Sequence, residues 1–222
     1  MFQLSPDTFS IFALMENQDK KRELIIEAAL KRFAHFGLNK TTMSEIASDI
    51  SFSKALLYYY FPDKLSLFAA VMKSIIDQIS EEMLQGLAKQ TSSYQAILFY
   101  LDKRQEFVRK YFNLLEFAIT SGPDLPAPLL QIFKQSRDSE INTLTSIIES
   151  GVQQQEFHIK NPGFCAEVLL DALAGMRMRY FLPGKMFYPD KSQFEEILIK
   201  EKQLATIFLN GLKNPDSAQL SF

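Results

Sequence analysis

Side chains that can bind phosphate and reach base edges gather in one short stretch of the chain. The stretch SFSKALLYYYFPDK, residues 51–64, holds two serines, two lysines and three consecutive tyrosines. A helix turns by about 100° per residue, so these tyrosines cannot all face one core. Hydroxyl and ammonium groups donate hydrogen bonds to phosphate oxygens, and short polar side chains read base edges. This composition indicates an outward surface that meets nucleic acid.

Two predicted helices precede this stretch. Apolar residues recur at three- and four-residue steps over residues 20–36, and Gly37 follows as a C-terminal stop. Thr42 and Glu45 have the spacing of a capping box, in which a hydroxyl and a carboxylate each satisfy an amide at a helix start. A short second helix should therefore run to about residue 50.

A third short helix should carry the tyrosines. Ser53 can cap its start, and Pro62 disfavours helical geometry at the residue before it, so the helix should end after two turns. Leu57 and Phe61, at an i, i+4 spacing, should face inward. The outer side then presents Ser53, Lys54, Tyr58 and Tyr59.

Two short helices joined by a tight bend form the helix-turn-helix arrangement, in which the second helix lies in the DNA major groove. The tyrosine hydroxyls then suit phosphate oxygens, whereas Ser53 and Lys54 can reach base edges. Thr42 and Lys64 each begin a helix, where free backbone amides and the positive end of the helix dipole also favour phosphate.

Residues 22–68 resemble the DNA-binding domain of the TetR family of bacterial transcription regulators. The matching residues are Ala28 to Phe33 (AALKRF), Phe36-Gly37, Thr41-Thr42, Ile46-Ala47, Phe52-Ser53-Lys54, Leu57-Tyr58, Tyr60-Phe61, Lys64, Leu67 and Phe68. The resemblance implies phosphate contacts from Thr42, Tyr58, Tyr60 and Lys64. It implies base contacts from Ser53, Lys54 and Tyr59.

The sequence departs from the family pattern near the bend. Ser51 and Ala55 stand where the family often has glycine, and Leu56 stands where it often has threonine. Leu56 could instead touch a thymine methyl group. The predicted DNA-contacting residues are Thr42, Ser53, Lys54, Leu56, Tyr58, Tyr59, Tyr60 and Lys64.

The rest of the chain also reads as helical, because helix formers dominate and alternation at strand spacing is hard to find. Asp63 can cap a long helix over residues 64–87. Further helices are expected near residues 94–111, 112–121, 128–150, 162–181 and 192–212, with breaks at Gly122-Pro123, Gly151, Pro162-Gly163 and Leu182-Pro183-Gly184. The predicted fold class is all-α.

The resemblance extends more weakly over this second part and implies a homodimer, built when the last two long helices pack against their symmetry mates. The predicted interface residues are Val168, Leu169, Ala172, Leu173, Leu204, Ile207, Phe208 and Gly211. A two-fold dimer would place two recognition helices in successive major grooves, so the operator should be an inverted repeat.

Phenylalanine, tyrosine and methionine are frequent in the middle helices. Core packing is the ordinary role of any one of them. As a set they also suit the wall of an apolar pocket, and the resemblance implies a small-molecule effector site in this domain. The candidate pocket residues are Met72, Phe107, Tyr111, Phe117, Met176 and Tyr180.

The expected organisation has four parts. Residues 1–18 form an N-terminal extension and residues 19–63 a three-helix helix-turn-helix domain. Residues 64–214 form a larger helical ligand-binding and dimerisation domain, and residues 215–222 form a tail.

Composition limits the other functions. The net charge of −2 argues against a wholly basic nucleic-acid coat protein, although residues 19–64 carry a basic excess. One cysteine, Cys165, and two separated histidines leave no set of metal ligands, so we expect no metal and no cofactor. Neither a bilayer-spanning apolar run nor a signal peptide is found, which favours a cytoplasmic protein with no membrane partner.

These features favour a transcription regulator, a repressor released from a palindromic operator by a small, mostly apolar ligand. The alternative is a helical adaptor that binds a protein partner and no longer reads DNA. No nucleophile, base and orienting group can be argued together, so no catalytic residues are predicted and an enzyme ranks third.

Overall fold

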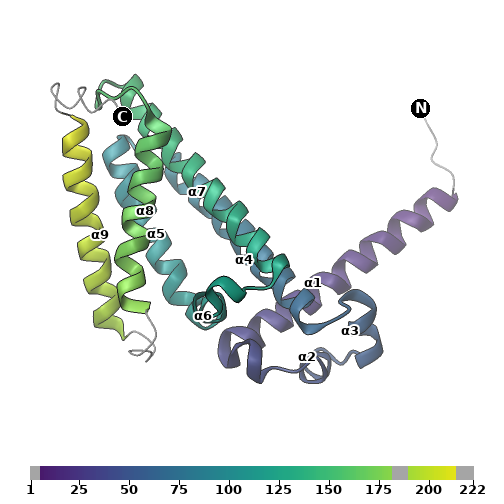
Figure 1. Cartoon of the computed structure of the whole chain (residues 1–222). Helices are drawn as coiled ribbons and strands as arrows, with labels where there is room; N and C mark the ends of the chain where they lie inside the picture. The colour runs from purple at the N-terminus through teal and green to yellow at the C-terminus, as the bar shows by residue number, and fades with distance from the viewer. Residues whose placement is uncertain (1–5, 182–189, 214–222) are drawn as a thin grey trace. The chain divides into compact units, whose positions relative to one another are not determined.

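The part of the chain that the computed structural model describes, residues 6–181 and 190–213, is helical and contains no strand, which confirms the all-α prediction (Figure 1). The helices are α1 (Pro6–Lys40), α2 (Met43–Asp49), α3 (Lys54–Tyr60), α4 (Lys64–Leu87), α5 (Ser93–Lys110), α6 (Phe112–Ser121), α7 (Ala127–Gln153), α8 (Pro162–Phe181) and α9 (Lys191–Leu212), with the 3-10 turn η1 (Gly122–Asp124) before α7.

The chain forms two compact units, unit 1 (Met1–Ile75) and unit 2 (Ile76–Phe222), which divide inside α4. The domain limits expected from the sequence placed this division at the start of that helix and stay predictions. In the described residues, α4 is one continuous helix that belongs to both units.

Local signals set the limits of the first two helices. Gly37 has φ 76° and ψ 171°, which breaks the helical geometry of α1 at the predicted stop. Thr42 Oγ1 accepts the Glu45 amide at 3.3 Å, and the Glu45 carboxylate accepts the Thr42 amide at 2.8 Å. The predicted capping box is confirmed. Helix α1 begins at Pro6, so the expected start at residue 20 is too late.

The third helix also begins and ends as predicted. Ser53 Oγ accepts the amide of the residue three positions on at 3.1 Å. Phe61 is extended, with φ −137° and ψ 110°, because Pro62 follows it. In the bend before α3, Ser51 has φ 56°, a left-handed conformation that glycine adopts at lower cost.

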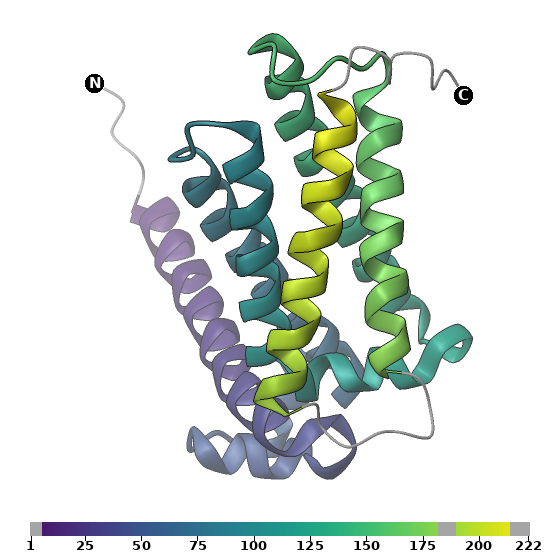
Figure 2. The same ribbon diagram turned by 90° about the vertical axis from the view of Figure 1, so that its left-hand side faces the viewer.

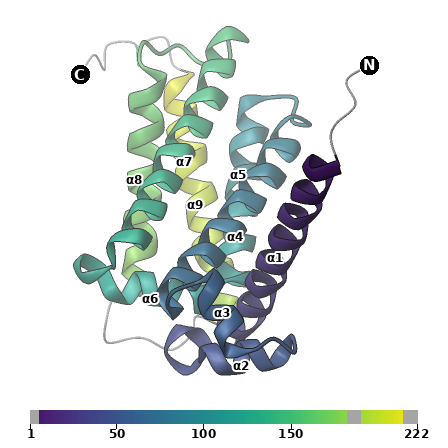
Figure 3. The ribbon, with the colours of Figure 1, turned by 90° about the vertical axis from the view of Figure 1, so that its right-hand side faces the viewer.

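Unit 1 contains a small apolar core between its helices. Helix α2 packs against α1 and α3 (Figure 3). The Phe33 ring of α1 meets the Phe68 ring of α4 edge to face, with 5.2 Å between centroids. Ile25, Ile46 and Leu57 are fully buried around them. Helices α1, α2 and α3 thus share one apolar centre with the start of α4.

Unit 2 is built around a second core. Helix α8 packs against α7 and α9, and α5 packs against α7 and α9; Figure 2 shows α8 and α9 side by side. Helix α7 runs through Gly151 to Gln153, so the break expected at Gly151 is wrong. A Cβ at Gly151 would lie 2.3 Å from the Phe157 ring, which means that this glycine admits a close aromatic contact.

A charged fork joins α1 to the end of α2. Arg32 Nε donates to Asp49 Oδ2 at 2.5 Å, and Arg32 Nη2 donates to Asp49 Oδ1 at 2.7 Å. The hydrogen bonds from Arg32, followed by its charge, hold the pKa of Asp49 below its ordinary value. Ionised Asp49 is therefore favoured in the folded state.

We expect Asp49→Asn to lower the stability of unit 1 at pH 7. A carboxyl whose pKa is lowered on folding contributes stability above its unfolded pKa of about 3.9, and that stability is lost as the pH falls through the folded value. The variant and the parent should therefore converge in acid. Urea titrations from pH 3 to pH 7, followed by circular dichroism, measure this.

Exposed Glu23 on α1 supplies the control, because Glu23→Gln removes the same charge from a group without that fork. Its stability profile should match that of the parent. A gap between Asp49→Asn and the parent that persists at pH 3 would contradict the ionic explanation.

Candidate functional site

Helix α3 turns its apolar residues inward and its tyrosines outward. Leu57 is 0% exposed and Phe61 is 4% exposed, whereas Tyr58 is exposed and Tyr59 is 71% exposed. Tyr60 is half-buried, and its ring meets the Tyr59 ring edge to face at 5.2 Å. The predicted orientation of the helix is confirmed, so an aromatic, hydroxyl-bearing surface is open on unit 1.

The N-terminal half of α3 adds a cation to this surface. Exposed Lys54 places its Nζ 5.8 Å from the centre of the Tyr58 ring, a cation–π distance. Ser53 is exposed, and its Oγ is the cap acceptor, which leaves its O–H as a donor. Leu56 is half-buried. These side chains can approach a groove from one end of the helix.

The amides expected to be free for phosphate are partly occupied. Thr42 Oγ1 donates to Glu45 Oε2 at 2.8 Å, and the Thr42 amide donates to the same oxygen. At the start of α4, the Ser66 amide donates to Asp63 Oδ1 at 2.6 Å, which confirms Asp63 as a cap. The Thr42 and Ser66 amides are therefore not free, because capping carboxylates already accept their hydrogen bonds, whereas a phosphate contact at Lys64 stays a prediction.

The same bonds shift two acidic groups. The side-chain and backbone hydrogen bonds of Thr42 lower the pKa of Glu45, and those of Ser66 lower the pKa of Asp63. Both carboxylates are thus kept ionised beside positions where phosphate is expected. A phosphate contact by Thr42 remains a prediction.

Lys64 has a role inside unit 1 that the sequence did not reveal. Its Nζ donates to the Leu38 carbonyl oxygen at 2.8 Å and to the Thr41 carbonyl oxygen at 3.0 Å. Thr41 Oγ1 in turn donates to the Gly37 carbonyl oxygen at 2.9 Å. The ammonium therefore ties the start of α4 to the connection between α1 and α2, with two of its three donors.

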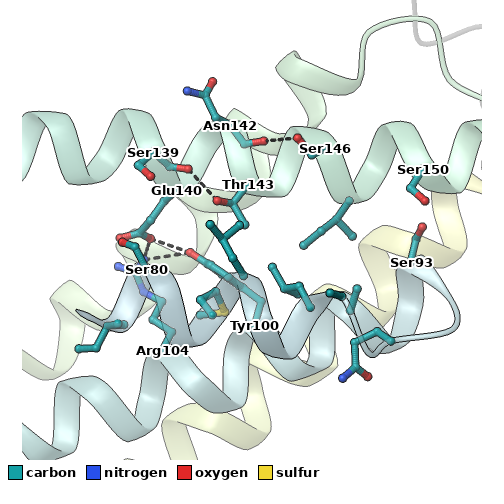
Figure 4. Close-up of a pocket in the computed structure, with 18 of the residues that line it drawn as sticks. Ser80, Ser93, Tyr100, Arg104, Ser139, Glu140, Asn142, Thr143, Ser146 and Ser150 are labelled. Atoms are coloured by element: carbon teal, nitrogen blue, oxygen red, sulfur yellow. Dashed lines mark hydrogen bonds and ion pairs between the residues drawn. The ribbon is translucent and has the colours of Figure 1, made fainter. Parts of the chain in front are cut away.

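A cavity of about 590 Å³ lies in unit 2 between α4, α5 and α7 (Figure 4). Of the six predicted pocket residues, Phe107 is the one among the described lining residues. Tyr111 is buried beside Phe107, with 5.4 Å between ring centroids, and Met72 is fully buried in unit 1.

The other three predicted pocket residues are not among the described residues that line the cavity. Phe117 and Met176 are half-buried and are absent from the described lining, and the Tyr180 side chain lies outside the described residues. Met72 is packed in the core of unit 1, whereas Tyr111 and Phe107 line a second, smaller cavity of about 40 Å³. The lining carries many hydroxyl groups instead, which aromatic frequency alone does not indicate.

The predicted interface residues fall on two sides of α8 and α9. Val168, Ala172, Ile207 and Gly211 are exposed, and Leu204 and Phe208 are half-buried. Leu169 and Leu173 are fully buried in the core of unit 2, so their prediction as interface residues is corrected. The adjacent α8 residues are exposed because neighbouring helical positions diverge by about 100°.

Further apolar side chains extend this exposed surface beyond the predicted residues. They are Phe164 and Met178 on α8 and Ile199 on α9.

The described residues give little support for a metal site, a reactive cysteine or a membrane-spanning helix. No group of three His, Cys, Asp or Glu side chains there could hold a metal ion. Burial raises the pKa of the Cys165 thiol, which disfavours the reactive thiolate. None of the helices in those residues combines the length and the apolar character needed to cross a membrane.

Comparison with known proteins identifies the family to which this helix-turn-helix unit is similar. The family model for "Bacterial regulatory proteins, tetR family" matches residues 25–71. A solved transcriptional regulator from Cytophaga hutchinsonii is 35% identical, aligns over 87% of this chain and 99% of its own, and has a TM-score of 0.77. The chain belongs to the TetR family.

TetR-family membership supports a DNA-binding regulator of transcription rather than an enzyme. The regulator RutR of Escherichia coli K12 is 35% identical over 41% of this chain. The negative regulator IcaR of the Staphylococcus aureus biofilm operon is 28% identical over 42% of this chain. The chain spans 42% of RutR and 53% of IcaR, so about half of these curated relatives.

Lys54 and Lys64, the first residues of α3 and α4, should behave differently on substitution. We expect Lys64→Met to lower the free energy of unfolding of unit 1 by about 1–3 kcal/mol, because two carbonyl oxygens lose their donor. Lys54→Met removes an exposed ammonium and should leave stability unchanged. Hydrogen exchange of the α1–α3 amides measures the stability of unit 1 in both variants. Equal protection in the two variants would refute the structural role of Lys64.

Proposed function

We propose that the protein is a homodimeric, cytoplasmic repressor that occupies an inverted-repeat operator and leaves it when a small ligand fills the unit 2 cavity. The observation that carries DNA binding is the orientation of α3, with Leu57 and Phe61 buried and Tyr58 and Tyr59 outward. Similarity to IcaR, a negative transcriptional regulator by name, supports repression.

In this proposal the exposed side of α3 enters the major groove. Ser53, Lys54 and Tyr59 meet base edges, and Leu56 packs on a thymine methyl group. Phosphates lie on the flanks, against Thr42, Tyr58 and Tyr60 and at the start of α4, where Lys64 has one donor left.

The exposed apolar residues of α8 and α9 supply the contact with a second copy. Ile207 is 64% exposed, and a Cβ at Gly211 would have open space around it. Isolated apolar residues are common on surfaces, but neighbouring ones along two packed helices favour association. Two recognition helices that enter successive major grooves would read half-sites about 34–36 Å apart.

Release requires that the ligand binds one conformer better than another, because equal affinity shifts no equilibrium. The continuous helix α4 is the proposed connection. Its first half contributes Phe68 to the unit 1 core, and its second half contributes Met83 to the cavity wall.

Lys54→Met should weaken binding to the selected operator by about 1–3 kcal/mol and relax base preference at one position in each half-site. Selection from a random duplex pool, followed by anisotropy titrations at several salt concentrations, measures both. Exposed Lys89, in unit 2, gives the control Lys89→Met, which should bind as the parent does. A parent that enriches no sequence and shows no salt dependence would favour the adaptor instead.

Ile207→Glu should dissociate the dimer, because a symmetric interface buries the new charge twice. We expect a loss of at least about 2 kcal/mol in dimer stability, measured by sedimentation velocity across a dilution series. Exposed Leu130 on α7 allows the matched control Leu130→Glu, which should remain dimeric. If Ile207→Glu stays dimeric, the α8–α9 surface is not the interface.

A further inference from the structure

The unit 2 cavity has two chemically different walls. Helix α4 contributes a mostly apolar wall of Ile76, Ile79, Met83, Leu84 and Leu87, with Ser80 as its one polar side chain among the described lining residues. Helix α7 contributes a polar wall of Ser136, Ser139, Asn142, Thr143, Ser146 and Ser150. Figure 4 shows how the labelled polar side chains of α7 lie along this wall. A molecule that fills the space between these helices meets both walls.

The charges in the cavity cancel. Of the described residues that line it, Arg104 and Glu140 are the ionised ones, and they form an ion pair. Tyr100 OH donates to Glu140 Oε2 at 2.6 Å, and Arg104 Nη1 donates to Tyr100 OH at 3.1 Å. An ionic ligand would lose its hydration and find no free counter-charge, so the lining disfavours it.

Two hydroxyl groups of the polar wall present acceptors. Thr143 Oγ1 donates to the Ser139 carbonyl oxygen at 2.9 Å, and Ser146 Oγ donates to the Asn142 carbonyl oxygen at 3.0 Å. Because each hydroxyl has one hydrogen and two lone pairs, these groups have only lone pairs left for a ligand. Ser150 Oγ accepts a hydrogen bond from Gln154 Nε2 at 2.9 Å and keeps its own hydrogen, and the Asn142 amide also carries donors. A ligand that matches this wall therefore needs groups that both donate and accept hydrogen bonds, as hydroxyl groups do.

Two buried polar atoms of the described lining residues lack a hydrogen-bond partner, Arg104 Nε and, toward the other end of the cavity, Ser93 Oγ. Ser93 is 3% exposed and lines the cavity, and its Oγ has no hydrogen-bond partner among the described residues. In Figure 4, Ser93 and Ser150 lie at the end away from Arg104. A buried hydroxyl without a partner is unfavourable, so a polar group of a ligand would be stabilised there.

We infer that the cavity binds an uncharged amphiphile whose apolar side packs on α4 and whose polar side carries hydroxyl groups toward α7. The inference rests on the proposed function only in taking this cavity as the effector site. It narrows the expectation of a mostly apolar ligand, because the α7 wall requires polar groups along one side.

Four probes that share a ten-carbon chain test this ligand class. They are 1-decanoylglycerol, which is uncharged with two hydroxyls, methyl decanoate, which is uncharged without donors, decanoate and decyltrimethylammonium. Calorimetric titration of the full chain below micellar concentrations should show 1-decanoylglycerol binding at least about fivefold more tightly than each of the others. An ion or the methyl ester that binds as tightly would overturn the inference.

Two threonines on α7 provide matched variants. Thr143→Val removes a lining acceptor and should weaken 1-decanoylglycerol about fivefold while leaving methyl decanoate unchanged. Thr145 is half-buried, lies outside the described lining and approaches Gly163, so Thr145→Val should change neither. If Thr143→Val weakens both probes equally, the hydroxyl acts on the fold and the inference fails.

Operator binding, measured on the same samples without probe, separates this inference from the proposed function. Selective binding of 1-decanoylglycerol by a protein that binds no operator would support the ligand class and refute the repressor. Operator binding with no preference among the four probes would support the DNA-binding function and refute the ligand class.

Discussion

The Lys64 ammonium holds together the part of unit 1 that presents α3. Helix α1 loses helical geometry at Gly37, which leaves carbonyl oxygens without intrahelical donors. Lys64, the first residue of α4, donates to two carbonyl oxygens in this connection, at Leu38 and Thr41. Helix α2 begins directly afterwards with its own capping box, so its start is fixed against both α1 and α4. The orientation of α3 follows, because α3 packs on α2.

Helix limits were predictable because the groups that set them lie close in sequence. Thr42 reaches Glu45 three residues away, and Pro62 acts on the residue before it. The Lys64 contact with Leu38 spans 26 residues, so no local pattern reports it. The inward direction of Leu57 and Phe61 was also readable, because an i, i+4 pair on a short helix has one side to bury.

The cavity could not be predicted in the same way. Aromatic frequency drew attention to Met72 and Tyr111, which are buried, whereas the polar wall is formed by small hydroxyl residues of α7. On a long amphipathic helix such residues read as a solvated side. These hydroxyl residues line a cavity only because α4, α5 and α7 leave a space between them. Tertiary packing sets that spacing, and the helical period of the sequence does not report it.

Two sides of one helix explain why half of the α8 interface prediction is corrected. Leu169 and Leu173 share a side with the core, whereas Val168 and Ala172 are one position earlier and exposed. Arg177 Nε lies 2.5 Å from Glu201 Oε1, so a buried ion pair ties α8 to α9 and fixes their register more than it adds stability. Burial lowers the pKa of Arg104, on which the charges of Arg177 and Glu201 act in opposite directions. The pKa of Arg104, in the wall of the cavity, therefore depends on the charges of the ion pair that joins α8 to α9.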